Sequence, residues 1–183
     1  MDNTKELETD RLILRKFRIE DAEGMFNNWA TDPLVNKYLS WPLHKNVEET
    51  KNIISKWISK YDEGSYNWIV ELKDNHEVIG SVCEEGKNLK HKTIAVGYCY
   101  GSKYWNKGYA SEALRKVIEY LLLDQGFYLV EANHRSSNPA SGRVMQKAGM
   151  KYDGTLRSRK LDPDGNRADM ICYSITMDEL KDK

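Results

Sequence analysis

Apolar and polar positions follow the two-residue period of strands in some stretches of the chain and the longer period of helices in others. Alternation predicts a first strand at Arg11–Phe17, and a helical pattern follows from Ile19 to Ala30. Asp32-Pro33 should end that helix, after which an irregular segment runs to Pro42. An apolar stripe at helical spacing predicts the next helix at Val47–Tyr61.

The middle of the chain predicts a hairpin and then a strand that leads into a long helix. Three strands are expected, at Asn67–Leu72, Val78–Cys83 and Thr93–Tyr100. The tight turn Asp74-Asn75 should join the first two as an antiparallel hairpin. A strongly amphipathic helix begins near Tyr109 and ends at Gln125-Gly126, and a strand at Tyr128–Asn133 completes a strand–helix–strand crossover.

The last third of the chain predicts one more helix and a closing hairpin. Asn138-Pro139 opens the helix, with proline at its first position, and Gly149 stops it. Strands at Lys151–Arg157 and Arg167–Met177 follow, joined across Asp162–Gly165. These elements predict a mixed α/β fold of the α+β type, organised as one domain over residues 1–183.

Composition narrows the class of protein and its partners. The 183 residues are 40% hydrophobic and 31% charged, with 28 basic and 28 acidic side chains, so bulk charge indicates neither nucleic acid nor an anionic membrane as a partner. The acidic start Met1–Asp10 lacks the apolar core of a signal peptide, and no apolar run has the length of a membrane span. Three widely spaced cysteines argue against a disulfide framework or a metal site and predict reduced thiols in the cytoplasm: Cys83, Cys99 and Cys172.

The segment from Tyr104 to Ala113, between a strand and a helix, is the most informative candidate site. A glycine-bearing turn there places free backbone N–H groups at a helix N-terminus, where a phosphate can bind. A P-loop and a dinucleotide fingerprint are both excluded, because Lys107-Gly108 is followed by Tyr109 and the further glycines are missing. What remains is a one-glycine turn whose amides, from about Asn106 to Ser111, can converge on one diphosphate.

Three motifs, in the expected order, resemble those of a known family. Gly97-Tyr98 and the run Tyr104–Ala113 resemble the acetyl-CoA signature of the GNAT superfamily of N-acetyltransferases. Asn138-Pro139-Ala140-Ser141, followed by Val144, Lys147 and Gly149, resembles the second motif on the coenzyme A side. The opening Thr9–Arg15 with Asp21-Ala22 resembles the branch that acetylates N-terminal alanine or serine residues of ribosomal proteins.

The resemblance implies how acetyl-CoA, the co-substrate, would be held. The sheet should be mostly antiparallel, with two central parallel strands that splay apart and helices that flank them. The pantetheine arm would lie in the gap like an added strand, with the side chain of Asn138 satisfying its amides. The implied cofactor-binding residues are Val96, Tyr98, Trp105, Asn106, Lys107, Gly108, Tyr109, Ala110, Ser111, Asn138 and Ser141.

The implied chemistry is direct attack of an acceptor amine on the thioester. A backbone N–H near Tyr98 would polarise the carbonyl. Ser141 is the candidate to protonate the leaving thiolate, the alternative being that its hydroxyl only bonds the backbone of its own helix. His134 is the histidine expected at the centre of the fold, with a catalytic role and a purely structural role as the two alternatives.

Two departures from the family pattern bear on this chemistry. Asn106 stands where a glycine is usual, and asparagine tolerates the left-handed backbone that the turn needs. Many relatives carry an acidic residue on the strand before Gly97, where this chain has Ile94 and Ala95. An α-amine with a pKa near ~7.8 is roughly a quarter neutral in the cytoplasm, against about one in a thousand for a lysine near ~10.4, so the missing base favours an N-terminal amine. Base help through water is still available from Glu84, Glu85 or His134.

Three functions fit these residues. The first is acetylation of a protein N-terminus of the ribosomal-protein type. The second is acetylation of a small amine such as a polyamine or an amino-sugar antibiotic, for which the few acidic candidates are not clustered in sequence: Asp32, Asp62, Glu84 and Glu85. The third is a non-enzymatic acyl-CoA-binding regulatory module. Because Met170–Met177 is apolar on both faces, as a buried strand or a dimer edge would be, monomer and homodimer both stay open.

One group of aromatic residues has two possible places in the fold. Most of them should pack in the core, with one or two lining an acceptor groove: Trp29, Tyr38, Trp41, Tyr66 and Trp68.

Overall fold

The computed structural model describes residues 3–39, 41–161 and 165–182. Its centre is an eight-stranded sheet with the order β1-β2-β3-β4-β5-β6-β8-β7. The strands are β1 (Leu7–Glu8), β2 (Leu12–Arg15), β3 (Asn67–Leu72), β4 (Val78–Asn88), β5 (Thr93–Tyr100), β6 (Leu129–Arg135), β7 (Lys151–Leu161) and β8 (Arg167–Thr176). All neighbouring pairs are antiparallel except β5 and β6, which are parallel. The predicted mixed fold with a central parallel pair is therefore confirmed.

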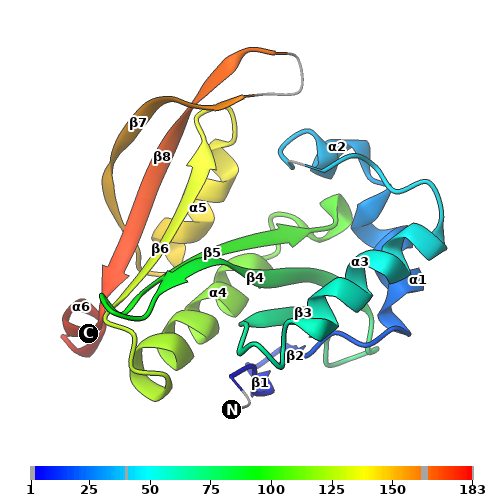
Figure 1. The fold of residues 1–183 in the computed structure, drawn as a ribbon, viewed down its shortest axis with the longest axis horizontal. Helices are drawn as coiled ribbons and strands as arrows, with labels where there is room; N and C mark the ends of the chain where they lie inside the picture. The colour runs from blue at the N-terminus through cyan, green and yellow to red at the C-terminus, as the bar shows by residue number, and fades with distance from the viewer. Residues whose placement is uncertain (1–2, 40, 162–164, 183) are drawn as a thin grey trace.

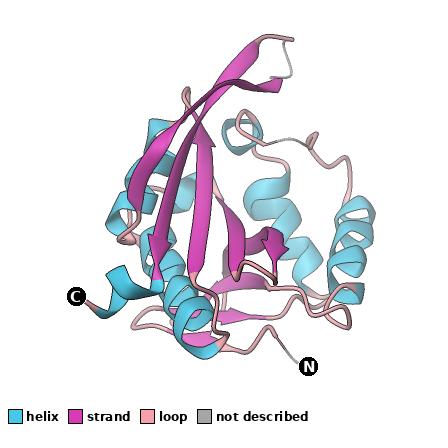
Figure 2. Cartoon of the chain, turned by 60° about the vertical axis from the view of Figure 1, so that its left-hand side comes forward, coloured by secondary structure: helices cyan, strands magenta, loops and turns pink. Residues whose placement is uncertain are grey.

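Helices cover both faces of the sheet (Figures 1 and 2). They are α1 (Asp21–Met25), α2 (Pro33–Asn36), α3 (Val47–Ser59), α4 (Tyr109–Glu119), α5 (Pro139–Lys147) and α6 (Met177–Lys181). Wider π-helical turns extend α1 through Ala30 and α4 through Asp124. A short 3₁₀ turn, Ser102–Tyr104, leads from β5 towards α4.

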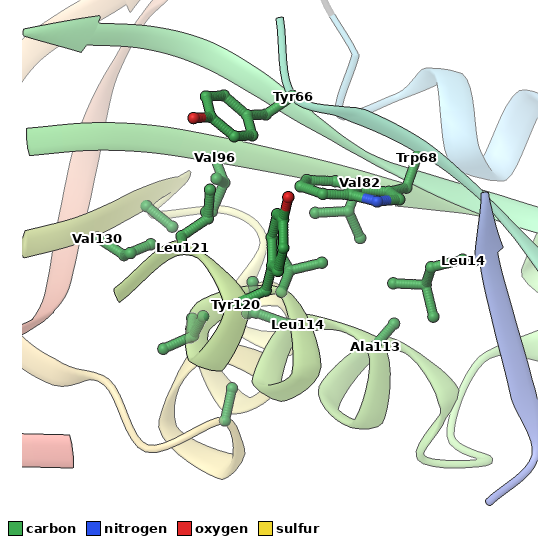
Figure 3. Packing of buried hydrophobic residues seen from close by; sticks show 14 of the residues in the cluster. Leu14, Tyr66, Trp68, Val82, Val96, Ala113, Leu114, Tyr120, Leu121 and Val130 are labelled. Carbon is green, nitrogen blue, oxygen red and sulfur yellow. The ribbon is translucent and has the colours of Figure 1, made fainter. Parts of the chain in front are cut away.

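Alternation along β3 shows why the sheet is covered on both sides. Trp68 and Val70 pack into a core cluster with α4, while Ile69 belongs to a second cluster with residues of α1 and α3. Figure 3 shows the first cluster, in which the ring of Tyr120 meets Trp68 edge-on at 5.9 Å between ring centroids. A strand with apolar residues on both faces needs a layer of helices on each face, as observed.

The parallel pair β5–β6 is joined only at one end. Paired residues run from Thr93 with Leu129 to Ala95 with Glu131, whereas β5 continues to Tyr100 and β6 to Arg135. Each strand keeps its other neighbour, because β5 pairs with β4 as far as Tyr100 and β6 pairs with β8 as far as Arg135. The two strands therefore splay, as the family resemblance implied, and leave backbone edges facing a gap between them.

Several element ends differ from the sequence prediction for local reasons. Asp32 caps a short helix, α2, where an irregular segment was expected, because its carboxylate accepts from the Leu34 amide and Pro33 fits the first turn. The last strand ends at Thr176, which forms a capping box with Glu179 and starts α6. Strand β8 lies between β6 and β7, so the edge interpretation of Met170–Met177 is wrong. Three residues of the predicted turn at 162–165 lie outside the described residues.

Candidate functional site

The turn between β5 and α4 has the backbone that a phosphate cradle needs. Gly108 is the N-cap of α4 with φ 85°, and Asn106 has φ 60°, so both adopt the left-handed conformation. The expectation for Asn106 is confirmed. Because Gly108 has no side chain, it leaves the first N–H groups of α4 uncovered. The helix dipole also favours an anion at this end of the helix.

These residues line a cavity of about 310 Å³, called the turn cavity below. From the predicted set it contains Trp105, Asn106, Gly108, Tyr109, Ala110, Ser111, Tyr98, Asn138 and Ser141. Lys107 lies apart from this lining, with its ammonium group 5.8 Å from the centre of the Tyr104 ring. Arg143 and Lys147 of α5 supply cations to the lining instead. Sequence reasoning missed Arg143, although its spacing of four residues from Lys147 places both on one helix face.

A brace from the N-terminal strands holds the turn in place. Glu112, in the first turn of α4, accepts hydrogen bonds from Thr9 Oγ1 at 2.6 Å and Arg11 Nε at 2.8 Å. Arg11 also donates from Nη1 to the Lys107 carbonyl at 3.0 Å, and its guanidinium lies 4.5 Å from the centre of the Tyr109 ring. Burial raises the pKa of Glu112, but the hydrogen bonds from Thr9 and Arg11 outweigh it and leave the pKa below its usual value.

A second cavity of about 420 Å³ lies between the splayed strands and is called the central cavity below. Its lining includes Ala95 to Tyr98 of β5, Asn133 to Arg135 of β6 and residues of the α2–α3 region. Five residues line both cavities: Tyr38, Leu39, Tyr98, Asn138 and Ser141. The two cavities therefore meet at these side chains, which are called the junction below. Of the aromatic residues considered for a groove, Tyr38 and Trp41 line the central cavity, while Trp29 and Trp68 are buried in the core.

A hydroxyl pair lies at the junction. Tyr98 Oη is 2.8 Å from the carbonyl oxygen of Ser141 and 2.8 Å from its Oγ. Because a carbonyl only accepts, Tyr98 donates to it, and the Ser141 hydroxyl then donates to Tyr98 Oη. Burial raises the pKa of Tyr98, so its proton stays in place at neutral pH.

Asn138 divides its side chain between two tasks. Its Oδ1 accepts from the Ser141 amide at 3.4 Å and so caps α5. The amide nitrogen Nδ2 is the half that remains for a ligand in either cavity. Val96, also in the predicted cofactor set, lines the central cavity rather than the turn cavity.

His134 has the contacts of a packing residue. Its Nδ1 lies 2.7 Å from the Arg135 carbonyl, which can only accept, so the proton is on Nδ1. The ring stacks on Tyr173 at 5.9 Å between centroids and lies against Gly142 of α5, where an added Cβ would come within 2.5 Å of Nε2. The ring lines the central cavity but is nearly buried, which favours the structural alternative.

The two acidic residues of β4 have different surroundings. Glu84 forms an ion pair with Lys87 at 3.0 Å, and only 15% of its side chain is exposed. Glu85 falls at a bulge, because Glu84 pairs with Val96 and Gly86 pairs with Ala95. Its carboxylate lies against Gly97, where an added Cβ would come 2.5 Å from Oε1 and would push this side chain aside. Glu85 is therefore the carboxylate turned towards β5 in the central cavity.

Two other kinds of site are absent from the described residues. No group of three or more histidine, cysteine, aspartate or glutamate side chains in that part of the chain could hold a metal ion. No helix in it has the length and apolarity to cross a membrane.

A mixed sheet opened between two parallel strands, with a turn whose backbone suits an anion on one side of the opening, is the architecture of an acyl-CoA-dependent transferase. The family model "Acetyltransferase (GNAT) domain" matches residues 11–151, which is more than half of the chain. The chain belongs to this family, and its enzyme class is N-acetyltransferase.

Relatives of known sequence agree with the assignment. The chain is 32% identical to the uncharacterised N-acetyltransferase YoaA of Bacillus subtilis over 170 residues, which cover 92% of this chain and 95% of that protein. It is 26% identical to the [ribosomal protein uS5]-alanine N-acetyltransferase of Escherichia coli, covering 93% of this chain and 90% of that protein.

Solved structures share the fold. A GNAT-family acetyltransferase from Bacillus anthracis has a TM-score of 0.84 at 27% identity and covers 95% of this chain and 99% of its own. The microcin C7 self-immunity acetyltransferase MccE, solved with acetyl-CoA and AMP, has a TM-score of 0.81 at 21% identity and covers 92% of this chain and 93% of its own. The predicted co-substrate, acetyl-CoA, is confirmed by the chain's membership of this acetyltransferase family.

Proposed function

We propose that residues 1–183 act as one N-acetyltransferase domain that moves the acetyl group of acetyl-CoA to the α-amine of a protein N-terminus. The observation that carries this proposal is the junction, where the turn cavity and the central cavity share Tyr98, Asn138 and Ser141. A group transfer needs two binding sites that meet at the reacting atoms, and the junction provides that meeting point.

The turn cavity suits coenzyme A. The left-handed turn at Asn106–Gly108 and the N-terminus of α4 would hold the diphosphate, with Arg143 and Lys147 close by. The open backbone edge of β5 beyond Ala95 and the amide nitrogen of Asn138 would bind the amides of the pantetheine arm. Bound acetyl-CoA would supply the activated acetyl group.

At the junction, groups of this chain would stabilise the developing negative charge and transfer protons. A backbone N–H near Tyr98 would stabilise negative charge on the acyl oxygen. The exchange forms a C–N bond and breaks a C–S bond, so one proton must leave the nitrogen and one must reach the sulfur. Ser141 would turn its hydroxyl from Tyr98 to the sulfur and donate from Oγ, and the Tyr98 proton would move from the Ser141 carbonyl to the Ser141 Oγ. A proton from solvent would restore Tyr98 after the products leave. His134 has no part in this proposal, because its contacts favour a structural role.

The nitrogen's proton would leave towards Glu85 through water. Glu85 is the carboxylate turned towards β5, whereas Glu84 is held by Lys87. An α-amine near pKa ~7.8 needs only modest help, so a distant base suffices for it.

The acceptor type rests on two supports. The protein resembles, at 26% identity, an enzyme named for a ribosomal-protein alanine. The carboxylates of the central cavity are also too few to favour a polyamine, because one of the two glutamates already has a lysine partner. A small amine is the alternative acceptor. The cytoplasm, in keeping with three free cysteines, is the proposed location.

The test is release of the coenzyme A thiol in the presence of a panel of peptides and small amines, with acetylated products identified by mass spectrometry. We expect acetyl transfer to peptide α-amines and much slower transfer to lysine side chains and polyamines. If coenzyme A binds tightly and no acceptor in the panel ever releases thiol, the enzyme assignment fails and the regulatory alternative stands.

A further inference from the structure

The central cavity carries more cationic than acidic side chains. Lys60 follows α3 and Lys160 lies in β7, so these two cations come from separate elements, while Arg135, which ends β6, also lines the cavity but has another interaction partner. The acidic lining consists of Glu84 and Glu85, and the ion pair with Lys87 offsets the first of these. The field in the cavity therefore favours an anion.

A built feature of β7 brings Lys160 to this cavity. Leu156 pairs with Met170 and Lys160 pairs with Ala168, so β7 places three residues opposite one in β8. The central one, Ser158, has φ 53°, donates its amide to Asp169 Oδ1 at 2.7 Å and accepts from Arg167 Nη1 at 3.1 Å. A bulge re-aims the strand beyond it, and this one is fixed by two side-chain hydrogen bonds.

The same bulge carries two further cations. Arg157 and Arg159 are exposed within it, and Arg159 directly precedes Lys160 in the sequence. These two residues are called the bulge arginines below. The described part of the β7–β8 hairpin extends beyond the ends of β5 and β6 in both views (Figures 1 and 2). A peptide that enters the central cavity from this end with its N-terminus first would have its following residues beside these cations.

We propose that the acceptor is a protein N-terminus whose first few residues after the amine carry acidic side chains. This inference rests on the proposed function, since it assigns the amine to the junction and the following carboxylates to Lys60, Lys160 and the bulge arginines. Lys60 and Lys160 line the same cavity as the junction residues. Because an extended peptide advances only about 3.3–3.6 Å per residue, the carboxylates of its first residues after the amine would lie in this cavity with the two lysines. A polyamine would meet repulsion from the same groups.

The experiment compares three peptides that differ only at positions two and three, which hold aspartate, asparagine or lysine after an N-terminal alanine. For the wild-type protein we expect kcat/KM for the aspartate peptide to exceed that for the asparagine peptide by about tenfold, mainly through KM, because several charges act together. The ratio should shrink when salt is raised to about 1 M, where screening acts within roughly 3 Å.

Charge variants locate the effect. Lys160→Gln and Lys60→Gln should each lower the aspartate-to-asparagine ratio by about two- to fivefold, as single exposed ion pairs do. Lys160→Glu should raise the relative rate of the lysine peptide. Lys90→Gln removes an exposed lysine outside both cavities and should leave the ratio unchanged.

The outcomes separate this inference from the proposed function. If wild-type protein acetylates all three peptides equally, or prefers asparagine or lysine, the acidic acceptor is wrong while N-terminal acetylation stands. If the ratio changes equally in Lys160→Gln and Lys90→Gln, the cavity cations are not its source and the inference fails. If no peptide accepts acetyl, the proposed function itself fails.

Discussion

The turn cavity and the central cavity differ in how the chain builds them. The turn cavity takes its proposed phosphate-binding side from one short stretch, Trp105–Ser111 without Lys107, and much of the rest from α5, with further lining from β5 and from residues 35–39. The central cavity is lined by elements as distant in sequence as α3 and β7. A site made of one local turn leaves a short motif in the sequence, while a site assembled by the fold leaves none. The cofactor site can therefore be predicted from this sequence, and the acceptor site cannot.

The largest effect is expected from a substitution that disrupts the turn cavity. Gly108→Val places a β-branched residue at φ 85°, with an added Cβ 3.3 Å from Arg11 Nη2. Such a backbone costs on the order of 1–3 kcal/mol, and the side chain would cover the N–H groups of α4. We expect acetyl-CoA affinity, measured by calorimetry, to fall by more than about 100-fold.

The matched control is Gly126→Val. Gly126 also has a positive φ, 72°, but nothing within 4 Å of an added Cβ, so it tests backbone strain without blocking the turn. A similar loss of affinity in both variants would show that strain, and not the cradle, explains the result.

The second prediction concerns the junction, where both cavities meet. Ser141→Ala should lower kcat by about 10- to 100-fold with little change in acetyl-CoA affinity, because general acid help is lost while the cradle is intact. Tyr98→Phe should lower kcat as well. If the two hydroxyls pass one proton, the double variant will be no slower than Ser141→Ala alone. Additive losses would mean that the hydroxyls act separately.

The third prediction concerns the brace behind the turn. The pKa of Glu112 in the folded protein lies below its ordinary value of 4.5, so its contribution to stability is fully present above about pH 4.5 and is lost as pH falls through the folded pKa. Glu112→Gln should therefore lower the melting temperature at pH 7 and converge with wild type in acid. Acetyl-CoA affinity should fall only a few-fold. Glu119→Gln on the same helix is the control, and an equal melting shift there would refute the brace.

The contrast between local and fold-assembled features also explains which parts of the structure the sequence predicts. Local signals were sufficient for β3 and β5, whose predicted and observed bounds coincide, and for the left-handed Asn106. The brace of Thr9 and Arg11 on Glu112 spans about a hundred positions and leaves no periodic signal.

The residues of the central cavity that matter for an acceptor were hidden for a similar reason. The direction of Glu85 depends on a bulge between β4 and β5, and that of Lys160 depends on two extra residues in β7. The spacing of hydrophobic residues encodes neither of these features. His134 shows the reverse case. The sequence left a catalytic and a structural role open, and its packed neighbours, Tyr173 and Gly142, favour the structural one.

The smallest expected effect tests whether the assembled cavity supplies a base at all. Glu85→Gln should lower kcat/KM for a peptide α-amine by only about twofold at pH 7.5, and the difference should vanish near pH 9, where an amine of pKa ~7.8 is almost entirely neutral. A lysine side-chain acceptor should lose more, because its amine stays charged over that range. Glu63→Gln, outside both cavities, is the control for net charge. A large, pH-independent loss for the α-amine peptide would assign Glu85 to acceptor binding instead, and the acidic-acceptor proposal would then have to place the amine, rather than a following residue, against this carboxylate.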